Sequence, residues 1–292
     1  FTIYDTADSR SALRGCIKEL SLDEKVYKPN EVLSRISVAK NNLITPAAYM
    51  ANATLIQNDV ASRRPKLGEV YSLYHKKCKQ AGAMDFDDIL LYTNLLFRDF
   101  PEELERLRSR FSFILVDEYQ DTNYAQYLII KKLAADHHNI CVVGDDAQSI
   151  YSFRGARIEN ILNFKKDYPD AREFRLEQNY RSTRTIVKAA NSLIAKNSNQ
   201  LEKRCFSSLA EGEKIKVVSA FTDQEEAFMV ASSILSRIYQ EKASYGDFAV
   251  LYRTNAQSRA VEEALRKRSL PYKIYGGHSF YERAEVKDMI SS

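Results

Sequence analysis

Short apolar runs that end in polar residues alternate with helix-forming segments along much of this chain. FSFILV (111–116) runs directly into two carboxylates, and NICVVG (139–144) runs into two more. A helix-forming segment, 123–135, lies between the two runs. Strands separated by helices at this spacing are typical of a parallel sheet. The alternation therefore predicts an α/β fold.

The composition limits the class of protein. At roughly 100–200 residues per domain, 292 residues indicate about two domains. Hydrophobic residues make up 45% of the chain, which can bury a core and excludes wholesale disorder. No run approaches the roughly 18 apolar residues of a membrane helix, so an integral membrane protein is excluded. The net charge of +4 does not by itself indicate a nucleic-acid partner. Four scattered cysteines without a C-x-x-C pair fit a reduced, cytoplasmic protein.

The first 85 residues have the pattern of a helical subdomain. Apolar residues recur at spacings of three and four within 8–20, 28–40, 46–63 and 67–82. Basic residues are frequent in this region, and they indicate either a solvated helical face or a surface that contacts phosphates. They are Lys40, Arg63, Arg64, Lys66, Lys76, Lys77 and Lys79.

Two α/β blocks are expected after residue 85. The first combines the two strands above with helices at 85–98, 123–135 and 157–166, and leads into a strand at 172–177. The second combines helices at 182–197, 223–240 and 256–268 with strands at 214–220, 247–253 and 272–276. The chain starts with Phe1 and stops inside an apparent helix, so we expect it to be a fragment of a longer protein.

Asp117 and Glu118 follow directly after the first apolar run. In an open α/β sheet, the carboxyl ends of the strands line the ligand crevice. A first carboxylate there can hold Mg²⁺, usually through water. The second can orient and deprotonate an attacking water, as in the Walker-B arrangement of nucleotide hydrolases. The alternative is a solvated turn, because acidic residues often follow strands.

The loop after the second run, in VVGDDAQSIYSFRGA (142–156), carries a different set of polar and aromatic residues. The Gln148 amide has both a donor and an acceptor, and could contact a γ-phosphate or the attacking water. Tyr151, Phe153 and Arg154 suit base stacking and a contact to a nucleic-acid backbone. The alternative is an aromatic cluster that closes a core.

A third segment, LEQNYRST (176–183), adds Tyr180 and Arg181. Tyr180 is a candidate stacking surface for adenine. The guanidinium of Arg181 could bridge phosphate oxygens. Alone, this pair is a weak signal.

Together, four long segments closely resemble the superfamily 1 DNA helicases of the UvrD/PcrA/Rep type. They are VDEYQDTN, VVGDDAQSIYSFRGA, LEQNYRST and AVLYRTNAQSRAVEEALRKRSLPYKIYGG, and they occur in the family's order. Supporting segments are ISVAKNNLI (36–44), MDFDDILLYTNLLF (84–97) and FYERAEVKDMI (280–290). The resemblance covers essentially the whole chain.

The resemblance implies RecA-like, P-loop NTPase-type parallel sheets, incomplete here, with an N-terminal helical insertion subdomain. Residues 1–85 would be the helical 1B-like subdomain. Residues 86–173 would be the second part of domain 1A, and residues 174–292 the first part of domain 2A. The implied activity is that of an ATP-dependent 3′→5′ DNA helicase and single-stranded DNA translocase, with ATP and Mg²⁺ as cofactors.

The family's functional residues carry over to matching positions of this sequence. Asp117 would coordinate Mg²⁺, Glu118 would be the catalytic base, and Gln148 would sense the γ-phosphate. Tyr180 would pack on adenine, and Arg181 would be the arginine finger. The DNA-contacting set would be Tyr151, Phe153, Arg154, Arg253 and Asn255. Phe153 stands where the family commonly has Trp, which leaves a smaller stacking face.

One expected motif is missing from these residues. No glycine in the chain is followed by lysine, so the P-loop pattern G-x-x-x-x-G-K-[ST] does not occur. The P-loop supplies most of the triphosphate cradle and a Mg²⁺ ligand. We therefore expect the 292-residue chain alone neither to hydrolyse ATP nor to unwind DNA.

Two other functions stay open at this point. One is a nucleic-acid-binding regulatory module without ATPase activity, and the other is a helicase subunit of a helicase–nuclease. The expected partners are single-stranded DNA and single/double-strand junctions, with repair or replication proteins and a second copy of the fragment as further candidates. No membrane association is expected.

Overall fold

The computed structural model describes residues 1–275 apart from 199 and 202, and it divides the chain into two units. The first unit is Phe1–Glu211 and the second is Gly212–Ser292. Among the described residues, no helix is both long enough and apolar enough to cross a membrane.

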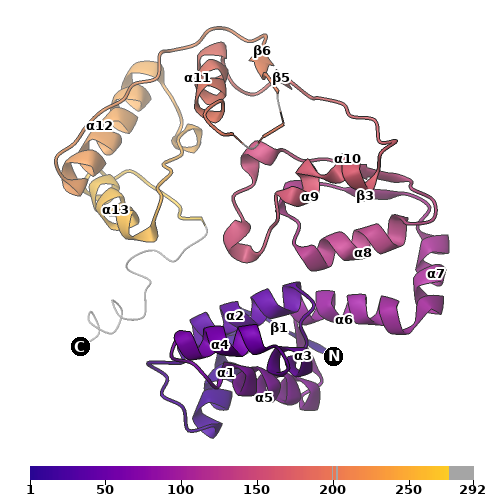
Figure 1. Ribbon diagram of the computed structural model, residues 1–292. Helices are drawn as coiled ribbons and strands as arrows, with labels where there is room; N and C mark the ends of the chain where they lie inside the picture. The colour runs from indigo at the N-terminus through magenta and orange to yellow at the C-terminus, as the bar shows by residue number, and fades with distance from the viewer. Residues whose placement is uncertain (199, 202, 276–292) are drawn as a thin grey trace. The chain divides into compact units, whose positions relative to one another are not determined.

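Five helices at the start of the first unit form the predicted helical subdomain (Figure 1). They are α1 (Thr6–Glu19), α2 (Pro29–Asn41), α3 (Pro46–Met50), α4 (Ala53–Ala61) and α5 (Leu67–Gln80). The range 46–63 was expected to be one helix. It forms two instead, because the Asn52 side chain accepts a hydrogen bond from the Leu55 amide and caps a new helix there. The core of this subdomain includes Leu13, Val32, Ile36, Leu67, Val70, Tyr71 and Tyr74.

A short parallel strand pair lies beside these helices, and the sequence pattern did not predict it. β1 (Thr2–Tyr4) pairs with β2 (Ala83–Asp85), so that Thr2 lies opposite Ala83. Three-residue strands are too short to show a period-two pattern. The pairing depends on contacts between segments about 80 residues apart, which local sequence does not reveal.

Lys40 is not on a solvated or phosphate-contacting face, contrary to expectation. Only 1% of its side chain is exposed. Its Nζ lies 2.6 Å from Asp85 Oδ2 and 2.8 Å from Asp88 Oδ1. The Tyr74 hydroxyl donates to the same Asp85 oxygen over 3.0 Å. The ion pairs compensate for burial of the lysine charge. They also connect α2 to the start of α6 (Phe86–Asp99).

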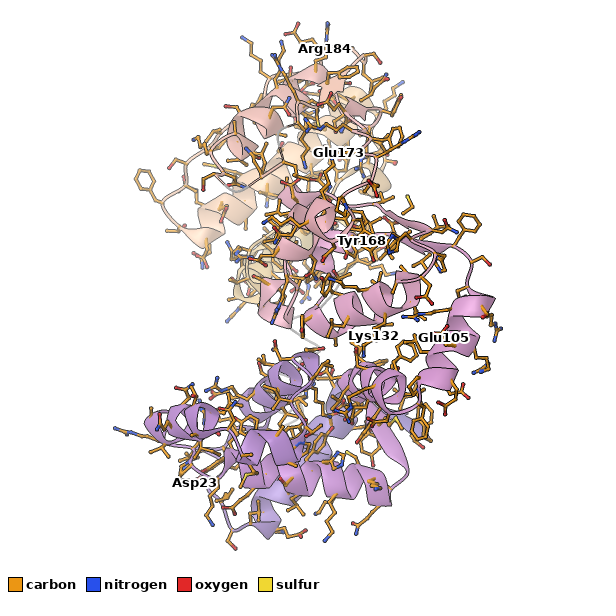
Figure 2. The ribbon with its side chains drawn as sticks, turned by 45° about the vertical axis from the view of Figure 1, so that its right-hand side comes forward. Asp23, Glu105, Lys132, Tyr168, Glu173 and Arg184 are labelled. Carbon is orange, nitrogen blue, oxygen red and sulfur yellow. The ribbon has the colours of Figure 1, made fainter. Side chains whose placement is uncertain are left out.

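The predicted first α/β block contains a parallel pair of strands, β3 (Ile114–Val116) and β4 (Ile140–Val142). The accompanying helices are α7 (Pro101–Arg110), α8 (Tyr124–Ala134), α9 (Glu159–Leu162) and α10 (Phe164–Asp167). Arg108 on α7 donates from Nε to the carbonyl oxygen of Lys132 on α8 over 2.9 Å, and also pairs with Glu105. Glu105 and Lys132 mark these two neighbouring helices in Figure 2.

The end of the first unit differs in part from the sequence prediction. The segment 172–177 is not a strand; instead, β5 (Gln178–Asn179) pairs in parallel with β6 (Phe206–Ser207), with α11 (Arg184–Ile194) between them. Phe174 and Leu176 are 81% and 88% exposed. An apolar run becomes a strand only where a neighbouring backbone satisfies its N–H and C=O groups. In this region that ladder begins at Gln178.

The described part of the second unit contains two packed helices, α12 (Asp223–Glu241) and α13 (Ser258–Lys267). Their shared core is formed by Ala227, Ala231, Ala264, Leu265 and Leu270. Strands were expected at 214–220 and 247–253, but neither segment is paired within the described part of the chain. Val217 and Leu251 are 94% and 90% exposed, so the apolar side chains that suggested strands are not buried.

The remaining expected strand, 272–276, is not formed over 272–275, and residue 276 and the segment 280–290 lie outside the described residues. Five 3₁₀ turns complete the described structure: Tyr119–Asp121, Asp146–Gln148, Ser152–Arg154, Tyr245–Asp247 and Asn255–Gln257. The fold is thus α/β with three two-stranded parallel pairs among the described residues.

Candidate active site

Two polar segments leave the same edge of the β3–β4 pair. Val116 lies opposite Val142 in the parallel register. Backbone hydrogen bonds extend this pairing beyond the strands, from Val143 N to Val116 O at 2.8 Å and from Tyr119 N to Val143 O at 2.9 Å. The Asp117–Glu118 pair and the loop that starts at Gly144 therefore lie side by side.

The backbone at Glu118 is in the left-handed region, with φ 49° and ψ 41°. The preceding Asp117 supports this turn, because its Oδ1 accepts a 2.9 Å hydrogen bond from the Glu118 amide. A non-glycine residue in this conformation costs about 1–2 kcal/mol. Such strain is concentrated at functional sites, where it sets the direction of a side chain. Both carboxylates are exposed.

Gln120 connects the two segments, and it was not among the residues predicted from the sequence. Its side-chain Nε2 donates to Glu118 Oε2 over 2.7 Å, and its Oε1 accepts from the Asp145 amide over 3.0 Å. Only 1% of the residue is exposed. A methyl group at Gly144 would lie 2.5 Å from this Oε1, so the glycine allows the close approach. One feature of the sequence could have indicated this role. Gln120 lies two residues after Glu118, and its side-chain amide can donate one hydrogen bond and accept another at the same time.

A cavity of about 370 Å³ opens beside the carboxylates. Asp117, Glu118 and Asp121 contribute to its lining. The Oδ1 atom of Asp121 is buried and has no hydrogen-bond partner among the described residues. Burial, followed by the nearby charge of Glu118, raises the pKa of Asp121. One of the carboxylates that line the cavity thus has a buried oxygen that a cation or a proton would satisfy.

The donor set beside this cavity is compatible with Mg²⁺. No group of three or more His, Cys, Asp or Glu side chains is arranged for a metal ion in the part of the chain that the structure describes. Mg²⁺ needs only one or two protein carboxylates, with water and phosphate oxygens as its other ligands. Asp117 and Asp121 provide hard oxygen donors of this kind.

Gln148 lies at the end of the 3₁₀ turn Asp146–Gln148 and is exposed. Its Nε2 donates to Asp145 Oδ2 over 2.9 Å. Burial alone would raise the pKa of Asp145, but hydrogen bonds from Lys203 and Gln148 outweigh it and lower this pKa below its usual value. Asp145 is therefore a charged acceptor that fixes the Gln148 amide.

The predicted stacking residues lie on the next turn of the same loop. The rings of Tyr151 and Phe153 are 5.9 Å apart and inclined by 38°. Tyr151 is 38% exposed and Phe153 is 73% exposed. The two rings therefore do not close a core, which was the alternative interpretation. The side chain of Arg154 lies outside the part of the chain that the structure describes.

Tyr180 and Arg181 lie on a turn immediately after β5. Asn179 Oδ1 accepts from the amides of Arg181 and Ser182, over 3.0 and 2.7 Å, and shapes this turn. Tyr180 is 76% exposed, and its hydroxyl donates to Gln178 over 2.9 Å. Among the described residues, no hydrogen bond or ion pair joins Tyr180 or Arg181 to the carboxylate pair. The structure therefore does not bring these residues together with Asp117 and Glu118.

Arg253 and Asn255 belong to the second unit. Gln257 Oε1 accepts from the amides of Arg253 and Thr254, over 3.0 and 2.9 Å. Asn255 starts the following 3₁₀ turn, and Ser258 Oγ donates to its carbonyl oxygen over 2.9 Å. Arg253 and Asn255 are both exposed on this short turn.

Residues 1–169 match the UvrD/REP helicase N-terminal domain. The chain belongs to the UvrD/REP helicase family. Residues 174–292 match the UvrD-like helicase C-terminal domain, and the resemblance found in the sequence motifs is confirmed.

Three relatives show how far the similarity extends. The chain is 45% identical over 291 residues to the ATP-dependent DNA helicase PcrA of Bacillus subtilis (strain 168). It is 44% identical over 291 residues to PcrA of Staphylococcus aureus (strain NCTC 8325 / PS 47), and 44% identical over 292 residues to PcrA of Leuconostoc citreum. Each match covers 100% of this chain but only 38–39% of the relative's length.

Proposed function

We propose that this chain is the part of an ATP-dependent DNA helicase that carries the hydrolytic carboxylates and a DNA-stacking loop. The observation that carries the proposal is the Gln120 bridge, which ties Glu118 to the loop of Gln148, Tyr151 and Phe153. Two hydrogen bonds thereby link the carboxylates to the start of the loop that carries the aromatic rings. A regulatory module without ATPase activity would need neither the carboxylate pair nor this link, so the helicase function is favoured.

In the proposed reaction, Glu118 accepts a proton from the water that attacks the γ-phosphate. Its turn conformation and the hydrogen bond from Gln120 support this role by fixing the carboxylate before the substrate binds. Asp117, with Asp121 beside it, would hold Mg²⁺, which when bound neutralises charge on the phosphate oxygens. Gln148 contacts the γ-phosphate, and its displacement is passed to Tyr151 and Phe153 through the backbone of one loop.

Arg181 would act as the arginine finger and Tyr180 would stack on adenine when the two parts of the enzyme close on ATP. Their exposure on a turn is consistent with residues that act on a ligand. Tyr151, Phe153, Arg154, Arg253 and Asn255 would contact single-stranded DNA. Base stacking and contacts to the sugar–phosphate backbone are the usual means of binding a single strand without reading its sequence.

The resemblance to the UvrD/REP family also supports a proposed division into domains. We assign residues 1–85 to a 1B-like subdomain, 86–173 to the second part of a RecA-like domain 1A, and 174–292 to the first part of domain 2A. We propose 3′→5′ translocation along single-stranded DNA, action at single/double-strand junctions, and a cytoplasmic location.

The test compares ATP turnover by the full-length product of the gene with turnover by the 292-residue chain. We expect the full-length protein to hydrolyse ATP with stimulation by single-stranded DNA, and Glu118→Gln to abolish this. Glu102→Gln, at an exposed glutamate on α7, is the matched control and should retain turnover. The isolated chain should be inactive because its sequence has no P-loop. Undiminished turnover by Glu118→Gln would contradict the proposed role.

A further inference from the structure

A lysine far from the loop in sequence holds the carboxylates that precede Gln148. Lys203 lies in the segment between α11 and β6, and its Nζ is 2.6 Å from Asp146 Oδ1. The same ammonium also pairs with Asp145 Oδ1. The amide of Leu201 donates to Asp146 Oδ2 over 2.8 Å, so Asp146 is held by both a charge and a backbone group.

Burial makes this ion pair more than a surface contact. The Asp146 side chain is 2% exposed and the Lys203 side chain 21% exposed. An unpaired carboxylate at such a position would carry a large desolvation penalty, and its neighbour Asp145 would repel it. One ammonium between two adjacent carboxylates removes most of that repulsion. Partial burial would lower the pKa of Lys203, but the hydrogen bonds that its ammonium donates to Asp145 and Asp146 outweigh this and raise the pKa, so the ammonium stays charged.

Asp145 contacts both Lys203 and Gln148, so the ion pair with Lys203 also affects the position of Gln148. Its Oδ1 pairs with Lys203 and accepts from the Ala147 amide over 3.0 Å, and its Oδ2 accepts from Gln148 Nε2 over 2.9 Å. The rotamer that presents one oxygen to Lys203 therefore presents the other to Gln148. Without the lysine, repulsion from Asp146 would favour a different orientation of Asp145.

We propose that Lys203 is a positioning residue for Gln148, because it fixes the Asp145 carboxylate that orients the Gln148 amide. This inference rests on the proposed function only for the role of Gln148 in turnover. The contact links the segment that follows α11 to the hydrolytic loop. Movement of that segment would release Asp145, and with it Gln148.

The first test measures the contact itself on the 292-residue chain. Lys203→Met keeps the length of the side chain and removes its charge, and Lys203→Arg keeps the charge. Lys188→Met, at an exposed lysine on α11, is the matched control. We expect hydrogen exchange at the Leu201 amide to rise at least tenfold in Lys203→Met and to stay near wild type in the other two. Unchanged exchange in Lys203→Met would overturn the contact.

The second test measures turnover by the full-length gene product. Misplacement of a group at a reaction centre costs about tenfold to a hundredfold in rate. We expect Lys203→Met to lower kcat by that factor with little change in KM for ATP, and Lys203→Arg to restore most of it. In a Gln148→Ala background, Lys203→Met should cause no further loss of kcat. A full additional loss in that background, or an unchanged kcat in Lys203→Met alone, would overturn the positioning role.

Asp145→Asn keeps the inference testable if Lys203→Met does not fold. It leaves the Lys203–Asp146 pair intact. Lys203 and Gln148 donate to different oxygens of Asp145, and the asparagine replaces one of these oxygens with an NH2 group that cannot accept. We expect the same selective loss of kcat, and an unchanged kcat would contradict the inference. Failure of the proposed function itself would give a different result. The wild-type full-length protein would then not hydrolyse ATP, but hydrogen exchange at the Leu201 amide would still be slow.

Discussion

Gln120 donates a 2.7 Å hydrogen bond from its side-chain amide to Glu118 Oε2. The same side chain accepts from the backbone of Asp145, so one buried group joins the segments that follow β3 and β4. Replacing Gln120 by Leu would leave the partly buried Asp145 amide without this acceptor. We expect a loss of about 1–3 kcal/mol in the free energy of unfolding, measured by urea denaturation. Gln80→Leu, at the exposed end of α5, should change it by less than about 0.5 kcal/mol.

The contact at Gly144 predicts a second loss of stability. A methyl group there would lie 2.5 Å from Gln120 Oε1 and 2.9 Å from Ile161 Cδ1. We expect Gly144→Ala to destabilise the fold by about 1–3 kcal/mol, because the buried Gln120 and the partly buried Ile161 must shift. At Gly246 an added methyl group meets no atom within 4 Å, so Gly246→Ala is the control. Equal urea midpoints for both variants would contradict this prediction.

The buried lysine of the helical subdomain predicts the largest effect on folding. Lys40→Met would leave Asp85 and Asp88 buried without their countercharge. Breaking a buried pair in this way typically costs about 3–5 kcal/mol. Lys76→Met, at an exposed lysine on α5, should stay within about 0.5 kcal/mol of wild type. Thermal and urea unfolding measure the stability of both variants. Equal stability of Lys40→Met and Lys76→Met would show that the fold does not need the Lys40 ion pairs.

Asp167 predicts a pH dependence of stability. Lys131 Nζ and the Tyr127 hydroxyl donate to its two oxygens, over 2.5 and 2.7 Å. Burial alone would raise its pKa, but these partners lower it below the usual 3.8. The unfolded chain therefore binds the proton more readily, and this stabilisation is present above the unfolded pKa and lost as the pH falls through the folded pKa.

We expect Asp167→Asn to be less stable than wild type at neutral pH, with a difference that shrinks as the pH falls below about 4. Urea denaturation at a series of pH values measures this difference. Asp170→Asn, at a nearby exposed aspartate, is the matched control, and its free energy of unfolding at neutral pH should stay within about 0.5 kcal/mol of wild type. A constant gap between wild type and Asp167→Asn across that range would argue against an Asp167 pKa that is lowered on folding.

Phe153 predicts an effect on DNA binding. Its ring is 73% exposed beside Tyr151, and a lost base stack costs about 1–3 kcal/mol. We expect Phe153→Ala to weaken binding of single-stranded DNA by that amount, measured by fluorescence anisotropy at fixed salt. Phe174→Ala removes an equally accessible ring, 81% exposed and outside the loop, and should leave binding unchanged. Equal losses for the two variants would indicate a nonspecific effect of removing an exposed ring.

The paired strands at the centre of the site were well predicted from the sequence. The runs that end before Asp117 and Asp145 did form neighbouring parallel strands, because each apolar run had a partner strand within reach. The runs at 214–220 and 247–253 had the same local character but no paired neighbour among the described residues. Local hydrophobicity therefore predicted a tendency to form strands, and only tertiary contacts decided which runs paired.

By itself, the sequence determined the family, the helical character of the first subdomain and the position of Asp117 and Glu118 at the end of a strand. These follow from residue order and local spacing. The tertiary structure alone decided that Lys40 is buried, that Gln120 joins two loops, and that Lys203 reaches Asp146 across 57 positions. The physical reason is that the environment of a polar side chain depends on partners distant in sequence, and burial then makes those partners indispensable.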